Sequence, residues 1–269
     1  MDKFKVFFRY FTEVIRNRRL LLKLVNNDLK AKNSGSFLGV IWVYIQPLVT
    51  ISVFWYVFQV GFKTSPVNNV KFIVWFVAAY VPWIYFNDSV MASSNCLYEY
   101  SYLVKKIKFK TSLLPLVKVL SASYIHIFFM AFTFFIYLIY GYDFKIAWFN
   151  IIYYSFCLFA LNIGLSWIVS SISVFVKDFS QFINILLQIG FWLTPIFWNP
   201  DTMSDKVMAV LKFNPIYYIV IGYRSCLING ISFWERGPIT IYFWCITGMV
   251  LILGALIFGK LRDHFADIL

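Results

Sequence analysis

Long stretches without a charged residue constrain this chain more than any other feature of its sequence. Residues 37–62 and 146–176 contain no charge, and a helix needs only about 20 apolar residues to cross a bilayer. Of the 269 residues, 61% are hydrophobic and 13% are charged, whereas soluble domains have about 25% charged residues. These proportions exclude a soluble enzyme, a disordered chain and a secreted disulfide scaffold, and they predict an integral membrane protein.

Six apolar stretches are predicted to span the membrane as helices. They are residues 37–62, 72–87, 111–142, 146–176, 179–200 and 239–259. An open sheet cannot satisfy its backbone in lipid, and no alternation of the barrel type is present, so the predicted fold class is an all-α integral membrane protein. We expect residues 37–269 to form a single transmembrane domain, with the second helix ending a little past Asp88.

Lysine and arginine are unequally distributed between the connecting segments. If the N-terminus is cytoplasmic, 17 of these residues lie on the inner side and 7 on the outer side. The positive-inside rule therefore predicts that both termini are cytoplasmic. Anionic lipid headgroups explain the net charge of +12, so no nucleic-acid partner is expected.

The first 36 residues are predicted to form a cytoplasmic amphipathic segment at the membrane surface. Within residues 1–19, several apolar side chains share one face of a helix: Phe4, Phe7, Phe8, Phe11 and Ile15. Such a helix either lies in the inner interface of the membrane or packs as a soluble helix on a partner.

Residues 201–237 are mostly apolar but are interrupted by Pro215 and Arg224. We expect two short re-entrant helices here, in the outer leaflet, because irregular backbone at membrane depth is tolerated only inside protein or against a cavity. Arg224 is expected to face a channel or to cap helix carbonyls near the outer exit. The alternative is that its side chain reaches the outer headgroups.

The sequence has few residues that could carry catalysis. His126 and His264 lie far apart without carboxylates at metal-ligand spacing, and acidic residues are nearly missing from the predicted spans. The stretch from Gly254 to Lys260 begins like a phosphate-binding loop, but Leu261 stands where Ser or Thr would ligate Mg²⁺. We therefore expect no metal or cofactor in this chain, and the near absence of ionisable groups in the spans predicts that another subunit supplies the energy for transport.

Aromatic residues make up 22% of the chain, and many lie on the first predicted span. Aromatic faces stack on sugar rings, so one face of this span and a facing wall on the fifth are a candidate polysaccharide channel. The residues are Trp42, Tyr44, Ile51, Trp55, Phe58, Gln59 and Phe62 on the first span, and Gln188, Phe191 and Trp192 on the fifth. The alternative is that these aromatics pack against helices or lipid.

The internal loop predicted at residues 95–110 mixes apolar side chains with four lysines. A short helix here would present an apolar face with basic flanks to a partner subunit. Its candidate coupling residues are Leu97, Tyr98, Tyr102, Leu103, Lys105 and Lys106. The alternative is a plain basic anchor of the positive-inside type.

Several motifs follow one another in a distinctive order. They are NDLKAK at 27–32, GSFLG at 35–39, LVKKI at 103–107, LLPL at 113–116, FVKD at 175–178, LQ at 187–188, TPI at 194–196, NP at 214–215 and YR at 223–224. Together they resemble the polysaccharide-export ABC permeases, the membrane subunits that export O antigen, group 2 capsule and wall teichoic acid. Two departures are Lys110 after Phe109, where the family usually has Pro, and Lys177 before Asp178, where Arg is commoner.

The resemblance implies a homodimer in the bacterial inner membrane, paired with two copies of an ATP-binding subunit and exporting a lipid-linked polysaccharide. It also implies that Asn214, Pro215 and Arg224 belong to re-entrant outer gate helices. The alternatives are a permease of a drug or small-lipid ABC exporter and a membrane enzyme acting on lipid-linked sugars. The enzyme would need paired carboxylates, whereas the twelve acidic residues are dispersed.

Overall fold

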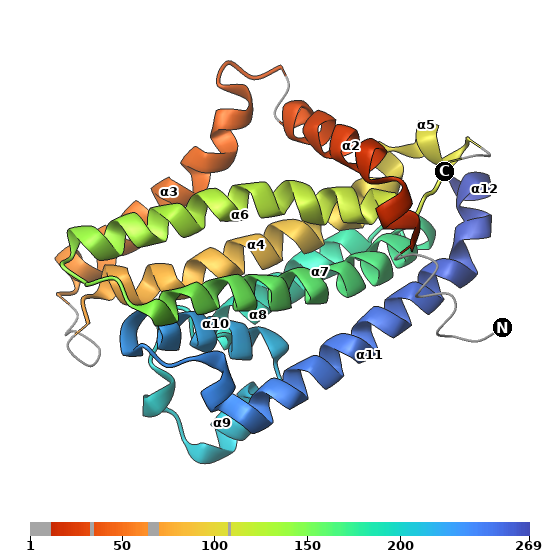
Figure 1. The fold of residues 1–269 in the computed structure, drawn as a ribbon. Helices are drawn as coiled ribbons and strands as arrows, with labels where there is room; N and C mark the ends of the chain where they lie inside the picture. The colour runs from red at the N-terminus through yellow and green to blue at the C-terminus, as the bar shows by residue number, and fades with distance from the viewer. Residues whose placement is uncertain (1–11, 33–34, 64–69, 107–108) are drawn as a thin grey trace.

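A computed structural model describes residues 12–32, 35–63, 70–106 and 109–269, and its regular elements are helices (Figure 1). They are α2 (Arg18–Ala31), α3 (Trp42–Trp55), α4 (Phe72–Glu99), α5 (Ser101–Val104), α6 (Leu113–Ile139), α7 (Asn150–Phe175), α8 (Phe179–Leu193), α9 (Asp205–Leu211), α10 (Pro215–Arg224), α11 (Gly237–Leu261) and α12 (Phe265–Ile268). The predicted all-α class is confirmed. Short π-helical turns extend α3 over Tyr56–Gly61 and α10 over Ser225–Asn229.

Four helical stretches among the described residues are long and apolar enough to cross a membrane. They are Gly39–Gly61, Leu113–Ile139, Ile146–Phe175 and Phe233–Ile268. Helix α8 is apolar but shorter, with 15 residues, and α4 has 28 residues and carries Asn87 and Asp88 within it. The chain is an integral membrane protein.

Helix α4 lies at the centre of the bundle, in contact with α3, α6, α7, α8 and α10. Its N-terminal half is enclosed on every side, and Phe76, Val77 and Ala78 have no exposed surface. Enclosure on all sides explains why this half has a continuous apolar sequence instead of an amphipathic one. In Figure 1, α4 runs beside α6 and α7 for most of its length.

Helices α7 and α11 cross at two glycines. A Cβ atom on Gly254 would lie 2.5 Å from the carbonyl oxygen of Gly164, and a Cβ atom on Gly164 would lie 2.9 Å from the backbone nitrogen of Leu251. Any larger residue would therefore push one backbone away from the other. This close approach is typical of small residues between membrane helices, where dispersion contacts hold the helices together.

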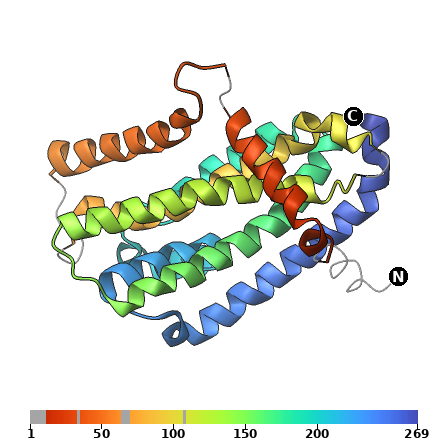
Figure 2. The ribbon, with the colours of Figure 1, turned by 45° about the horizontal axis from the view of Figure 1, so that its top comes forward.

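Helix α3 stands away from the rest of the bundle along much of its length (Figure 2). It meets α4 near its C-terminal end, where the ring centroids of Phe54 and Phe76 are 5.0 Å apart. Beyond that end, the rings of Phe58 and Phe72 stack with centroids 4.9 Å apart. Aromatic rings therefore join the C-terminal end of α3 to α4.

The structure changes two predicted boundaries. Helix α4 continues through Asp88 to Glu99, because its buried face extends through Ser89, Ser93 and Leu97. Residues 95–99 are therefore helical and not part of a loop, and α5 is the short helix that follows. Asp88, expected at a helix end, lies well inside α4.

The two predicted non-spanning segments also gain detail. Residues 1–36 contain α2, which packs on α6 through Leu21, Leu24 and Val25 and was not predicted. The amphipathic helix predicted at residues 1–19 lies mostly outside the described residues. Residues 201–237 contain two short α-helices, α9 and α10, as expected in number. Helices α2, α5 and α12 gather at one end of the bundle (Figure 1).

Candidate functional site

A cavity of about 680 Å³ opens between α3, α4 and α8. Three helices and the residue after α2 line it. The lining residues are Val43, Gln46, Pro47, Thr50 and Phe54 of α3; Tyr80, Trp83, Ile84, Asn87, Asp88, Met91 and Ala92 of α4; Leu187, Gln188, Phe191 and Trp192 of α8; and Lys32. Phe54, one of its wall residues, also packs on Phe76 of α4, with ring centroids 5.0 Å apart.

The cavity wall combines aromatic rings with uncharged polar groups. Phe191 connects two of the rings, with centroids 5.7 Å from Trp83 and 6.3 Å from Tyr80. Amide and hydroxyl groups of Gln46, Thr50 and Gln188 lie on the same wall. Rings that stack and amides that hydrogen-bond are the chemistry that holds a sugar, since a sugar has apolar ring faces and polar edges.

The structure brings only part of the predicted channel set to this cavity. Gln188, Phe191 and Trp192 of α8 line it, whereas none of the seven predicted residues of the first span does. The face of α3 on the cavity carries Val43, Gln46, Pro47, Thr50 and Phe54 instead. These positions lie about 100° around the helix from the predicted stripe, because each residue turns an α-helix by that angle.

The predicted residues of α3 have other surroundings. The ring of Tyr44 meets that of Phe128 on α6 at 4.7 Å, and Ile51 is buried. Phe58 stacks on Phe72, as described above. Trp42, Trp55 and Phe62 are exposed to the surroundings of the protein, and Gln59 is half-buried.

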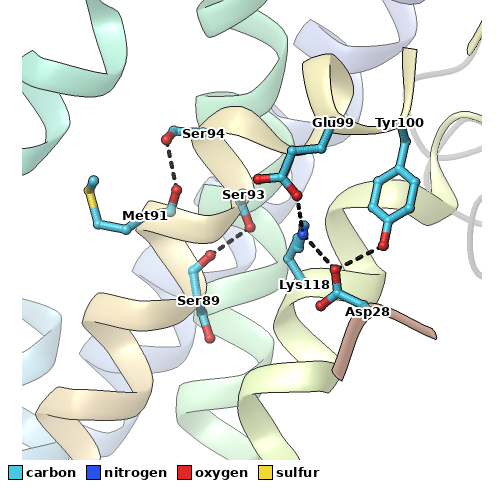
Figure 3. Close-up of polar contacts among 8 residues, drawn as sticks. All are labelled: Asp28, Ser89, Met91, Ser93, Ser94, Glu99, Tyr100 and Lys118. Atoms are coloured by element: carbon cyan, nitrogen blue, oxygen red, sulfur yellow. Dashed lines mark hydrogen bonds and ion pairs between the residues drawn. The ribbon is translucent and has the colours of Figure 1, made fainter. Parts of the chain in front are cut away.

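Inside the bundle, Lys118 of α6 pairs with two carboxylates (Figure 3). Its Nζ lies 2.5 Å from Asp28 Oδ1 on α2 and 2.5 Å from Glu99 Oε2 at the end of α4. The Lys118 and Asp28 side chains are 6% and 3% exposed, whereas that of Glu99 is half exposed. We call these three residues and Tyr100 the ionic cluster, which joins three helices beside α5.

Tyr100, which directly follows α4, completes this cluster. Its hydroxyl donates a hydrogen bond to Asp28 Oδ1 at 2.8 Å. The pKa of Tyr100 is raised far above its ordinary value. Burial is the largest cause, and the hydrogen bond to Asp28 and the charge of that carboxylate also raise it. The hydroxyl therefore remains a donor at physiological pH. Sequence analysis missed Asp28 and Glu99, although Lys118 within an apolar stretch required partners.

Two serine hydroxyls of α4 near this cluster donate to carbonyl oxygens of their own helix (Figure 3). The Ser93 hydroxyl donates to the Ser89 carbonyl at 2.6 Å, and the Ser94 hydroxyl donates to the Met91 carbonyl at 2.7 Å. Such bonds allow serine in a buried helix face without a partner on another helix.

The predicted coupling residues divide into buried and exposed members. Leu97 is enclosed, Leu103 is half-buried, and the Tyr98 hydroxyl donates to the Val174 carbonyl at 3.1 Å. The members with an exposed surface beside α5 are Tyr102, Lys105 and Lys106. Only these three, with the exposed part of Tyr98, could meet a partner without a change in packing.

Arg224, a predicted gate residue, is buried and bound to carbonyl oxygens. Its Nε donates to Trp75 at 3.1 Å, and its Nη1 and Nη2 donate to Pro195 and Ile196 after the end of α8. The guanidinium also lies 3.3 Å from the centre of the Trp75 ring. The expectation that Arg224 caps carbonyl groups matches this geometry. The alternative, that its side chain reaches the lipid headgroups, does not match it.

Asn214 and Pro215 begin α10. The Asn214 side chain accepts from the Ile216 amide at 3.0 Å and donates to Thr194 Oγ1 at 3.2 Å, and Pro215 occupies the first helical position. This is the arrangement that favours a helix start. Asn214 therefore holds the beginning of α10 to the segment after α8, and Arg224 holds the last turn of α10 to the same segment.

Comparison with known proteins places the chain in a family. The model of the ABC-2 type transporter family matches residues 19–228, from α2 through most of the turn after α10. The chain belongs to this family. The predicted resemblance to polysaccharide-export ABC permeases is thereby confirmed, and ABC-2 proteins are membrane subunits of transporters.

Three relatives of this ABC-2 chain are similar over nearly its whole length, and all carry the name O-antigen export system permease protein RfbA. Two come from Klebsiella pneumoniae: one is 27% identical over 257 residues, covering 93% of this chain and 95% of the relative, and the other is 26% identical over 253 residues with the same coverage. The third, from Myxococcus xanthus, is 24% identical over 266 residues, covering 96% of this chain and 98% of the relative.

Proposed function

We propose that this chain is the membrane-spanning subunit of an ATP-driven exporter that moves a lipid-linked polysaccharide out of the cytoplasm. The observation that carries the proposal is the end-to-end similarity to three O-antigen export permeases. The cavity between α3, α4 and α8 supports it, because its aromatic and amide wall suits sugar rings. O antigen is the first candidate polymer, with capsule and teichoic acid as alternatives.

The proposed membrane arrangement uses six helices. Helices α4 and α8 are added to the four long apolar stretches, and both termini lie in the cytoplasm of a bacterium with the chain in its inner membrane. Placing α2, α5 and α12 on the cytoplasmic side agrees with the positive-inside rule. On this arrangement α9 and α10 are the outer gate helices, and the exposed residues beside α5 face the ATPase.

The proposed assembly contains two copies of this chain and two ATP-binding subunits. The chain supplies the path and the partner supplies hydrolysis, so ATP and Mg²⁺ belong to the partner. Repeated weak contacts suit a sliding polymer, because an aromatic contact contributes only about 0.5–1.5 kcal/mol beyond its buried area and so does not trap the chain.

Deletion of the gene, followed by complementation, tests the function. Surface polysaccharide should disappear on deletion, lipid-linked polymer should accumulate inside, and the wild-type gene should restore export. A tagged chain should also copurify with an ATP-binding protein. Unchanged surface glycan combined with increased sensitivity to small amphiphiles would favour a drug or small-lipid exporter instead.

A further inference from the structure

The charges on the cavity wall are few and balanced. Asp88 and Lys32 are the charged residues among the described side chains that line the cavity. Asp88 lies inside α4, and Lys32 directly follows α2. The Asn87 amide also donates to Asp88 Oδ1 at 3.4 Å. Beyond this pair the wall is aromatic, aliphatic, amide or hydroxyl.

Among the described residues, the two buried cations have their partners outside the cavity. Lys118 is paired with Asp28 and Glu99, and Arg224 is bound to three carbonyl oxygens. Neither residue lines the cavity. The wall therefore offers one cation, and a carboxylate on the same wall offsets its charge.

Such a wall distinguishes polymers by charge. An anionic group that leaves water for a site of low dielectric needs a compensating positive charge, and a polymer with a charge on each repeat would bring several anions into the membrane at once. A neutral sugar needs only stacking surfaces and hydrogen-bond partners. A carboxylate accepts hydrogen bonds from sugar hydroxyls, whereas it repels a phosphodiester or a uronic acid.

We propose that this cavity selects uncharged glycans and that Asp88 is a specificity-determining residue that disfavours polyanionic polymers. The inference rests on the proposed function, since it treats the cavity as the place where glycan is bound. Among the candidate cargoes it favours a neutral O-antigen-like glycan over a polyol-phosphate teichoic acid or an acidic capsule.

The test compares two probes that share one backbone and differ in charge. A galacturonic acid heptamer and its fully methyl-esterified form are titrated onto the full-length chain in lipid nanodiscs, and saturation-transfer NMR reports binding. The wild-type chain should bind the neutral ester at least about tenfold more tightly, because juxtaposed like charges reject a wrong ligand. Asp88→Asn should narrow this preference, and Asp88→Lys should reverse it.

A matched control removes a carboxylate outside the cavity. Asp143→Asn, in the exposed connection after α6, makes the same change in net charge and should leave the preference as in wild type. Raised salt gives a test on the wild-type chain alone: it should strengthen binding of the acidic probe, because repulsion is screened, and leave the neutral probe unaffected.

The outcomes separate this inference from the function beneath it. Equal wild-type binding of the two probes, or a preference that survives both Asp88 variants, would overturn the role of Asp88 while leaving a glycan-binding cavity. Failure of both probes to bind would overturn this inference, because the cavity would then not be a glycan site. Unchanged surface glycan in the deletion strain would overturn the proposed function as well.

Discussion

Lys118 on α6 and Asp28 on α2 form an ion pair, Nζ to Oδ1 at 2.5 Å, with both side chains almost completely enclosed. At the end of α4, Glu99 forms a second ion pair with Lys118, and the Tyr100 hydroxyl donates a hydrogen bond to Asp28. Since α5 begins at Ser101, the ionic cluster fixes α2 directly to the segment proposed to face the ATPase.

Asp28→Asn should therefore destabilise the protein strongly. Removing one partner from a buried ion pair costs about 3–5 kcal/mol, because the remaining charge is left without full compensation. Thermal unfolding in detergent, followed by size-exclusion chromatography, would measure the loss. The double variant Lys118→Met with Asp28→Leu should recover much of it.

The exposed pair of Arg262 and Asp263 provides the control for that prediction. Their Nε and Oδ1 atoms are 3.2 Å apart, but the Asp263 side chain is largely exposed. Asp263→Asn should change stability by less than about 1 kcal/mol, as surface ion pairs do. An equal loss in Asp28→Asn and Asp263→Asn would show that the ionic cluster contributes nothing special.

Gly254→Ala should weaken the crossing of α7 and α11. Its Cβ atom would lie 2.5 Å from the Gly164 carbonyl oxygen, and overpacking of this kind costs about 1–3 kcal/mol. Gly248→Ala on the same helix meets open space and should be neutral or slightly stabilising. Melting temperatures of the two variants in one detergent decide the matter, and similar values would contradict close packing at Gly254.

Arg224→Lys should lower stability even though the charge is kept. A lysine cannot reproduce the fork that reaches three carbonyl oxygens, and hydrogen bonds from charged groups are worth about 1.5–3 kcal/mol each. Arg19→Lys, the same substitution at an exposed position of α2, is the matched control and should melt like wild type. An Arg224→Lys variant as stable as the control would mean that the carbonyl contacts are unimportant.

Phe54→Leu and Trp55→Leu compare two faces of α3 with neighbouring residues. Phe54 lines the cavity, whereas Trp55 belongs to the stripe predicted from sequence and is exposed. If the polymer uses the cavity, surface polysaccharide should fall in Phe54→Leu at normal protein level and stay normal in Trp55→Leu. The opposite result would favour the predicted stripe. Quantitative glycan staining and immunoblotting measure the two quantities separately.

Tyr102→Ala combined with Lys105→Ala should impair coupling without loss of folding. These side chains are exposed, so their removal leaves the core intact and should not shift the melting temperature. The transport-linked ATPase activity of the full complex should fall. Leu97→Ala is the contrasting variant: it should lose about 2–5 kcal/mol of stability, because it leaves a cavity in the core.

Much of the fold followed from hydrophobicity. Charge-free stretches gave the long helices, because a helix that crosses lipid must be apolar throughout. The end of α4 could not be found in this way. Its last turns are buried by other helices while carrying serines that bond within their own helix, so composition there resembles a loop.

The candidate site was predicted less well, and the reason lies in α3. Apolar residues lie on every side of that helix, including the side that also carries Gln46 and Thr50, so periodicity could not indicate which face meets α4 and α8. Gln188, Phe191 and Trp192 of α8 line the cavity, and their role in a channel stays a prediction. Asp88 also lines the cavity, but it was not among the predicted site residues because its helix was expected to end there. The partners of Lys118 could not be predicted either, because Asp28 lies 90 residues away from it in the sequence.

Lys118 and Arg224 have one further property in common: the described partners of both cations precede them in the chain. Asp28, Glu99 and Tyr100 come before Lys118, and Trp75, Pro195 and Ile196 come before Arg224. A ribosome makes the N-terminal elements first. When each cation leaves the ribosome, the groups that neutralise or solvate it have already been synthesised, so neither charge has to wait in the bilayer for a later segment.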